Sequence, residues 1–255
     1  MSPSRLLLDL GNTRLKWVLQ SASVEVARGA VAWSDDVGTI LADDWRGLPA
    51  PQQVWGASVV DAAREALVAS IISTRYAQSA YWLRTPAEAC GVRNAYAEPE
   101  RLGVDRFLAM VAAYDQGRAP CVLVGVGTAL TLDALAADGR HLGGLIAPGP
   151  QLMQQSLLGA TARVRPERPG LVLDAADNTA DAVASGCWQA AAALVERFMA
   201  RMTPKLGGAM AINLGGGDAE QLLPLLTQPA QLLPDGVLRG LAVWANAHTS
   251  AMSSP

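Results

Sequence analysis

The chain has 255 residues and a formal charge of −3, with 51% hydrophobic and 17% charged residues. A chain of this length forms one large domain or two compact halves. Its small negative charge gives no attraction to nucleic acid, so we expect no nucleic-acid partner. No apolar run approaches the roughly 18 residues of a membrane span, and Asp9 interrupts the first apolar run, which is too short for a signal peptide. The three widely spaced cysteines fit reduced thiols. We therefore expect a cytoplasmic protein without a membrane partner.

The first half of the chain alternates short apolar runs with turn residues. The run 6–8, the turn residues 9–13 and the run 15–19 predict a strand, a tight turn and the second arm of a hairpin. The other elements that we expect in this half are, in chain order, a strand at 54–60, a helix at 61–73, a short strand at 81–83, a loop at 93–103 and a helix at 105–114.

The second half opens with the same plan as the first. A buried-strand run at 121–124 leads into a glycine turn, and an alternating strand follows at 130–135. Placing Gly11 on Gly127, which sets Leu15 on Thr131, suggests an internal duplication of one α/β unit. We therefore predict two halves, residues 1–118 and 119–255.

A third glycine turn, at 213–218, follows an apolar strand at 210–212 and precedes a helix at 219–226. Residues 179–202 predict a long amphipathic helix, bent or broken near Ser185-Gly186. The two histidines, His141 and His248, belong to no motif, and we expect both at the surface.

Glycine turns that follow strands can bind phosphate. Glycine lets the backbone approach a ligand closely and leaves successive N–H groups to donate to phosphate oxygens. Asp9 places a carboxylate beside the first turn, where it could hold Mg²⁺ directly or through water, and Lys16 adds a cation. The pattern is not a P-loop, because no G-x-x-x-x-G-K-[ST] occurs. Any single turn is more simply an ordinary hairpin; the coincidence of three favours a polyphosphate site.

The motifs in this order resemble those of type III pantothenate kinases, and the resemblance extends from Asp9 to about Ala242. The segments that carry it are Asp9-Leu10-Gly11-Asn12-Thr13-x-x-Lys16, Asn94-x-Tyr96, Gly103-Val104-Asp105-Arg106, Gly127-Thr128-Ala129-Leu130-Thr131-x-Asp133, Gly143-Gly144-x-Ile146-x-Pro148-Gly149, Asn178-Thr179-x-x-Ala182-Val183-x-Ser185-Gly186 and Leu214-Gly215-Gly216-Gly217-Asp218.

This resemblance implies an α/β fold of two ribonuclease H-like halves around a central ATP cleft, as in actin-like ATPases and sugar kinases. It implies phosphorylation of pantothenate by ATP with Mg²⁺, a monovalent cation (K⁺ or NH₄⁺), and a homodimer whose substrate site lies at the subunit interface. It makes Asp105 the catalytic base. The implied ATP and phosphate contacts are Asp9, Leu10, Gly11, Asn12, Thr13, Arg14, Leu15, Lys16, Gly127 and Thr128, and the implied pantothenate contacts are Tyr96, Gly103, Val104, Asp105, Arg106 and Thr179.

The chain departs from the family pattern at Gly125. Relatives often have an aspartate there, which helps to hold the monovalent cation, whereas glycine offers no side-chain ligand. We therefore expect weaker dependence on a monovalent cation than in relatives with the aspartate.

Each candidate residue also has a structural alternative. Asp105 stands where a helix begins and could be an N-terminal cap, as could Thr179. Asp9 could be a turn aspartate that hydrogen-bonds its own backbone, and Lys16 a solvated surface lysine. Tyr96 could pack on the core.

Arg106 could pair with a neighbouring acid rather than with the substrate carboxylate.

Two other functions compete with the pantothenate kinase: a kinase or phosphohydrolase for another small molecule, and a non-catalytic regulator. The loop with Tyr96 and Asp105 argues against the first, and the intact Asp9, Lys16 and Asp105 argue against the second.

Overall fold

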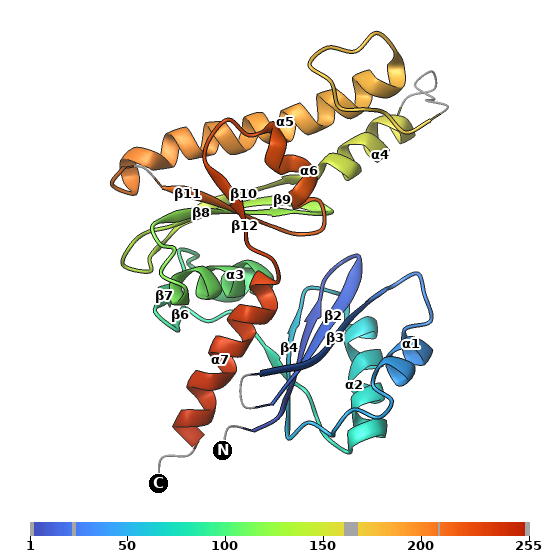
Figure 1. Ribbon diagram of the computed structural model, residues 1–255. Helices are drawn as coiled ribbons and strands as arrows, with labels where there is room; N and C mark the ends of the chain where they lie inside the picture. The colour runs from blue at the N-terminus through green and yellow to red at the C-terminus, as the bar shows by residue number, and fades with distance from the viewer. Residues whose placement is uncertain (1–2, 22–23, 161–167, 209, 253–255) are drawn as a thin grey trace. The chain divides into compact units, whose positions relative to one another are not determined.

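The computed structural model describes residues 3–21, 24–160, 168–208 and 210–252, and the chain forms two compact units. Unit 1 comprises Met1–Gln116 and Gly236–Pro255, and unit 2 comprises Gly117–Asp235. Each unit is built on a five-stranded sheet (Figure 1). No helix in the described ranges is long and apolar enough to cross a membrane.

The elements of unit 1 are β1 (Arg5–Leu10), β2 (Arg14–Ser21), β3 (Val24–Ala32), α1 (Val37–Asp44), β4 (Gln53–Ser58), α2 (Ala62–Tyr76), β5 (Tyr81–Leu83), β6 (Glu88–Ala89), β7 (Val92–Arg93), a 3₁₀ turn (Pro99–Arg101), α3 (Val104–Asp115) and α7 (Gly236–Met252). Those of unit 2 are β8 (Cys121–Val126), β9 (Ala129–Leu135), β10 (His141–Pro148), α4 (Pro150–Ala160), α5 (Thr179–Met202), β11 (Ala211–Gly215), α6 (Ala219–Leu222), β12 (Ala230–Leu232) and 3₁₀ turns at Thr203–Lys205 and Leu223–Leu225.

The two sheets have the same topology. Their strand orders are β3-β2-β1-β4-β5 and β10-β9-β8-β11-β12. In each, the first three strands of the unit form an antiparallel meander, and the last two run parallel to the first. The repeated strand–turn–strand plan is therefore confirmed as part of a larger repeated unit.

The register of the first hairpins corrects our alignment of the two halves. Leu10 pairs with Leu15 in unit 1, and Val126 pairs with Leu130 in unit 2. Leu15 is thus equivalent to Leu130 and not to Thr131. The first turn is one residue longer than the second, which makes Thr13 the structural equivalent of Thr128.

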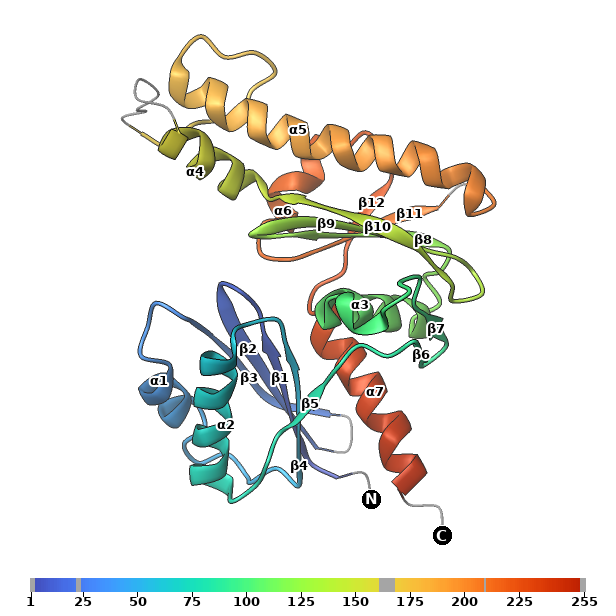
Figure 2. The same ribbon diagram turned by 180° about the vertical axis from the view of Figure 1, so that it is seen from behind.

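In unit 1 the sheet is covered on both faces. Strand residues alternate between faces, and Leu6, Leu8 and Leu10 pack with residues of α1 and α2 in one apolar cluster. The opposite face carries α7, which contacts β1 and β4 and packs along α3 (Figure 2). Asp9 and Lys16, which are paired across the β1–β2 hairpin, belong to this second face.

The core of unit 2 lies between its sheet and α5. Val122, Val124 and Val126 of β8 pack with Trp188 and Val195 of α5. By alternation, Gly125, Thr131 and Asp133 belong to the opposite face of the sheet.

Several elements differ from the expectation. The helix α5 runs without a break through Ser185 and Gly186 (Figure 1). Trp188 and its apolar neighbours bury one side of the helix, and this packing outweighs the low helix propensity of one glycine. The helix after the third turn, α6, ends at Leu222, before Pro224, and not at residue 226. The strand before that turn, β11, extends to Gly215 and not only to residue 212.

The last helix, α7, was not predicted. Its contacts with α3, β1 and β4 group it with unit 1. The division of the chain at 118/119 into two ribonuclease H-like halves stays a prediction.

Candidate functional site

The first glycine turn joins β1 to β2 and is held from behind by Trp33. The Gly11 N–H donates to the Arg14 carbonyl at 3.2 Å, which closes the turn. The backbone N–H of Trp33 donates to the Thr13 carbonyl at 3.2 Å, and its indole Nε1–H donates to the Gly11 carbonyl at 2.7 Å. Asn12 and Thr13 are exposed at the tip. The turn therefore has a fixed conformation with its tip open to solvent.

Asp9 and Lys16 flank this turn on the same face of the sheet. Both side chains are half-buried. A magnesium ion bound to a nucleotide takes one or two protein carboxylates and fills its other positions with phosphate oxygens and water. The single carboxylate of Asp9 fits that donor set, with Lys16 beside it as a cation for a phosphate. Among the residues that the structure describes, no group of three or more His, Cys, Asp or Glu side chains could hold a metal ion by itself.

The second glycine turn joins β8 to β9 and is closed in the same way. The Gly127 N–H donates to the Ala129 carbonyl at 3.1 Å, and the Gly149 N–H donates to the Thr128 carbonyl at 2.9 Å. A Cβ at position 149 would collide with the Gly127 carbonyl oxygen, so only glycine allows this approach.

The third glycine turn lies beside the second in unit 2. Gly215 of β11 is paired with Gly125 of β8, and the Asp218 N–H donates to the Val126 carbonyl at 3.1 Å. The carboxyl ends of two parallel strands therefore bring both turns to one edge of the sheet.

Gly125 provides no side-chain ligand, and the hydroxyl of Thr131 occupies the space where its side chain would begin. A Cβ at position 125 would lie 2.5 Å from Thr131 Oγ1, which belongs to the paired residue on β9. A neutral hydroxyl thus occupies the space beside position 125, and this position supplies no carboxylate for a cation.

Asp105 lies in the first turn of α3, whose N-cap is Gly103. Asp105 is therefore not the N-cap residue, although its carboxylate accepts one of the first N–H groups of the helix. Its Oδ1 accepts the backbone N–H of Arg106 at 2.8 Å, and a Cβ on Gly103 would lie only 2.5 Å from that oxygen. The missing side chain of Gly103 leaves room for the carboxylate, which explains the G-x-D spacing. The positive end of the helix dipole stabilises a carboxylate there.

Tyr96 and Arg106 form one group in the same unit. Arg106 is buried, and its Nη1 donates to the Tyr96 hydroxyl at 3.2 Å, with the guanidinium 5.9 Å from the ring centroid. Asn94 shapes the loop, because its Oδ1 accepts the Tyr96 N–H at 2.9 Å and its Nδ2 donates to the Pro99 carbonyl at 3.0 Å. The structure thus brings Tyr96, Gly103, Asp105 and Arg106 together at the start of α3.

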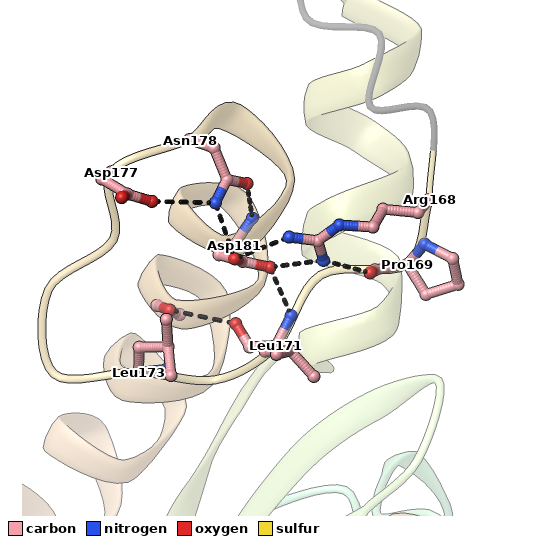
Figure 3. Close-up of polar contacts among 8 residues, drawn as sticks. Arg168, Pro169, Leu171, Leu173, Asp177, Asn178 and Asp181 are labelled. Carbon is pink, nitrogen blue, oxygen red and sulfur yellow. Dashed lines mark hydrogen bonds and ion pairs between the residues drawn. The ribbon is translucent and has the colours of Figure 1, made fainter.

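Thr179 is the first residue of α5 and is exposed. The N-cap is Asn178, whose side chain accepts the Asp181 N–H at 3.1 Å, so the alternative that Thr179 is the cap is wrong. Figure 3 shows how Asp181 fixes this end of the helix: its carboxylate accepts hydrogen bonds from Arg168 (2.8 and 2.9 Å), the Leu171 N–H (2.7 Å) and Asn178 Nδ2 (2.7 Å). These hydrogen bonds, Arg168 first, hold the pKa of Asp181 far below its ordinary value.

The predicted site residues are thus divided between the units. Unit 1 holds the first turn with Asp9 and Lys16, and the Tyr96–Arg106 group with Asp105. Unit 2 holds the second turn, with Gly127 and Thr128, and Thr179.

Comparison with known proteins decides the family. The family model of type III pantothenate kinases matches residues 5–201. A type III pantothenate kinase from Aromatoleum aromaticum is 40% identical over 246 residues, covering 96% of this chain and 99% of the relative. Those from Xanthomonas campestris and Nitrosospira multiformis are 40% and 37% identical, covering 97% and 99% of this chain and 99% and 95% of the relatives.

The chain belongs to the type III pantothenate kinase family. Among solved structures, a conserved Baf family protein from Campylobacter jejuni has a TM-score of 0.63 at 18% identity and covers 96% of this chain and 99% of its own. An activator of 2-hydroxyisocaproyl-CoA dehydratase from Clostridium difficile, with bound ADPNP, has a TM-score of 0.57 at 11% identity and covers 99% and 98%. These likenesses confirm the predicted fold class, an α/β fold, and the two sheets of one topology agree with it.

Besides α7, sequence reasoning missed the surroundings of three side chains. His141 is buried, not exposed, and its Nε2 lies 2.9 Å from Asp133 Oδ1 on the neighbouring strand. His248 is half-buried and stacks on Trp244, one helical turn earlier. The contact of Trp33 with the first turn joins residues 22 positions apart, and no local pattern indicates it.

Proposed function

We propose that this chain transfers the γ-phosphoryl group of ATP to the primary hydroxyl of pantothenate, giving ADP and 4′-phosphopantothenate, the first step of coenzyme A synthesis. The observation that carries the proposal is the group at the start of α3, where hydrogen bonds join Asp105, Arg106 and Tyr96. Gly103 leaves room beside them for the Asp105 carboxylate. The family membership supplies the substrate.

In the proposed reaction, Asp105 accepts the proton of the pantothenate hydroxyl. The hydroxyl oxygen forms a bond to the γ-phosphorus as the bond from that phosphorus to the ADP oxygen breaks. Arg106 and Tyr96 bind the pantothenate end of the reacting pair, with the guanidinium suited to the substrate carboxylate. Thr179 would supply a further contact to pantothenate.

The glycine turns hold the triphosphate. Backbone N–H groups of the first turn, residues 10–15, and of Gly127 and Thr128 in the second would donate to phosphate oxygens, with Lys16 as a cation. Asp9 would hold Mg²⁺ directly or through water. When bound, the ion neutralises the charge of the transferring phosphoryl group.

We propose that a monovalent cation contributes little to this enzyme. Gly125 has no side chain, and the Thr131 hydroxyl fills the adjacent space. Position 125 therefore lacks the carboxylate that the family resemblance assigns to binding this cation.

We also propose a homodimer in the cytoplasm. The apolar residues 190–195 of α5 do not supply a face between subunits, because Ala191, Ala192 and Val195 pack into the core of their own unit. A better candidate is the set of exposed leucines of unit 2, on β10, α4 and the segment before α5: Leu145, Leu157, Leu171 and Leu173. Thr179 follows that segment and could reach a neighbouring subunit.

An ADP-release assay with pantothenate, pantetheine and several sugars tests the function directly. We expect turnover with pantothenate and none with the sugars. Turnover of a sugar in preference to pantothenate would favour a kinase for another alcohol, and no turnover with any acceptor would favour a non-catalytic regulator.

A further inference from the structure

The hydrogen bonds of Trp33 are the starting point. Trp33 follows β3, the third strand of unit 1, and donates both its backbone N–H and its indole N–H to the first glycine turn. The acceptors are the carbonyl oxygens of Thr13 and Gly11, at 3.2 and 2.7 Å. Two of the turn's carbonyl oxygens are therefore directed towards β3.

Unit 2 repeats this arrangement by another means. Gly149 follows β10, the third strand of that unit, and its N–H donates to the carbonyl of Thr128, the equivalent of Thr13. Its Cα packs so closely on the Gly127 carbonyl that no side chain fits. The carbonyl of the turn glycine is thus contacted from the same position in both units, by an indole donor in one and by a close backbone approach in the other.

This contact matters for binding an anion. A turn binds phosphate when its N–H groups face the ligand, and a carbonyl oxygen turned the same way repels it. The Arg64 guanidinium lies 5.2 Å from the centroid of the Trp33 ring and helps to fix its plane. We infer that Trp33 is a positioning residue for the nucleotide: its indole N–H holds the first turn in the conformation that receives the phosphates.

The test is binding of a non-hydrolysable ATP analogue with Mg²⁺, measured by calorimetry in the absence of pantothenate. The substitution Trp33→Phe keeps an aromatic ring beside Arg64 and removes the indole donor. We expect the dissociation constant to rise about fivefold, the factor that one net hydrogen bond supports, with the KM for pantothenate unchanged.

Trp17→Phe is the matched control. The indole Nε1 of Trp17 also donates a hydrogen bond in unit 1, to Asp44 Oδ2 at 3.3 Å, but Asp44 ends α1 and is not part of the turn. We expect this variant to lower thermal stability and to bind the analogue as the wild type does. A purely structural role for Trp33 predicts the same behaviour for both variants.

Wild-type affinity in Trp33→Phe, or an equal loss in Trp17→Phe, would overturn the inference. If Trp33→Phe does not fold, 3-benzothienylalanine at position 33 keeps the shape of the ring and removes only the N–H, and the same two outcomes apply. The inference rests on the proposed use of the first turn for ATP. Because no pantothenate is present in the binding test, an inability to phosphorylate pantothenate would count against the proposed function alone.

Discussion

The carboxylate of Asp105 folds back over Gly103 and accepts the Arg106 N–H. We predict that Asp105→Asn keeps this hydrogen bond, because the amide oxygen can accept it, and therefore folds normally. The variant cannot take up the hydroxyl proton, so kcat for pantothenate should fall about a hundredfold or more. Steady-state kinetics and the thermal midpoint check both parts.

The same substitution at the other end of α3 provides the control. Asp115→Asn changes the exposed last residue of the helix and should leave kcat unchanged. Equal activity of Asp105→Asn and the wild type would remove Asp105 from the mechanism.

Gly125 leads to a prediction about salts. We expect kcat to change little when K⁺ is replaced by Na⁺ at constant ionic strength, because no carboxylate is present at this position. Gly125→Asp should introduce a dependence on K⁺, provided that the Thr131 hydroxyl, 2.5 Å from the new Cβ, moves aside. A strict requirement for K⁺ in the wild type would contradict this interpretation of the site.

At the scale of elements, the start of α5 depends on Asp181. Its pKa is lowered mainly by Arg168, with Asn178 and the Leu171 N–H contributing. A lowered pKa stabilises the fold at every pH above the ordinary aspartate value of about 3.9, and this stability is lost as the pH falls towards the folded-state pKa. We predict that Asp181→Asn lowers the unfolding midpoint at pH 7 and that its difference from the wild type shrinks below about pH 4.

Ser185→Ala is the control for this prediction. Ser185 holds the same segment, through the Leu173 N–H at 2.9 Å and the Leu171 carbonyl at 3.3 Å, without a titrating group. Its loss of stability should not change with pH in the same range. A pH-independent difference for Asp181→Asn as well would show that the carboxylate charge does not contribute.

The elements that sequence reasoning found are those with local signals. The glycine turns and the strands before them were predicted because turn chemistry and apolar runs lie within a few residues of one another. The predicted break near Gly186 was wrong, since the burial of Trp188 and its neighbours outweighs the low helix propensity of one glycine. The environment of His141 and the role of Trp33 could not be predicted, because each depends on a partner on another strand or turn.

At the scale of the whole molecule, the two units share one topology, yet each contributes different parts of the proposed site. Asp105, the proposed catalytic base, and the first turn belong to unit 1, and the second and third turns to unit 2. The shared topology gives each unit one glycine turn of the same kind, and we propose that both turns bind phosphate while the loop before α3 binds the alcohol. The family membership and the internal order of motifs could be predicted from the sequence because the motifs span nearly the whole chain.

The subunit arrangement is tested by light scattering. We predict a mass twice that of one chain, because the exposed leucines of β10, α4 and the segment before α5 need a covering surface. Leu171→Glu should shift the protein towards the monomer and raise the KM for pantothenate, if Thr179 serves the neighbouring site. A fully active monomer would contradict this part of the account.

The most direct test of the central claim is a crystal structure with a non-hydrolysable ATP analogue, Mg²⁺ and pantothenate. We predict that the phosphates accept hydrogen bonds from the turns at residues 11–13 and 127–128, and that an Asp105 carboxylate oxygen lies within about 3 Å of the pantothenate hydroxyl. A complex in which Asp105 is remote from that hydroxyl, or in which the turns contact only solvent, would contradict the account.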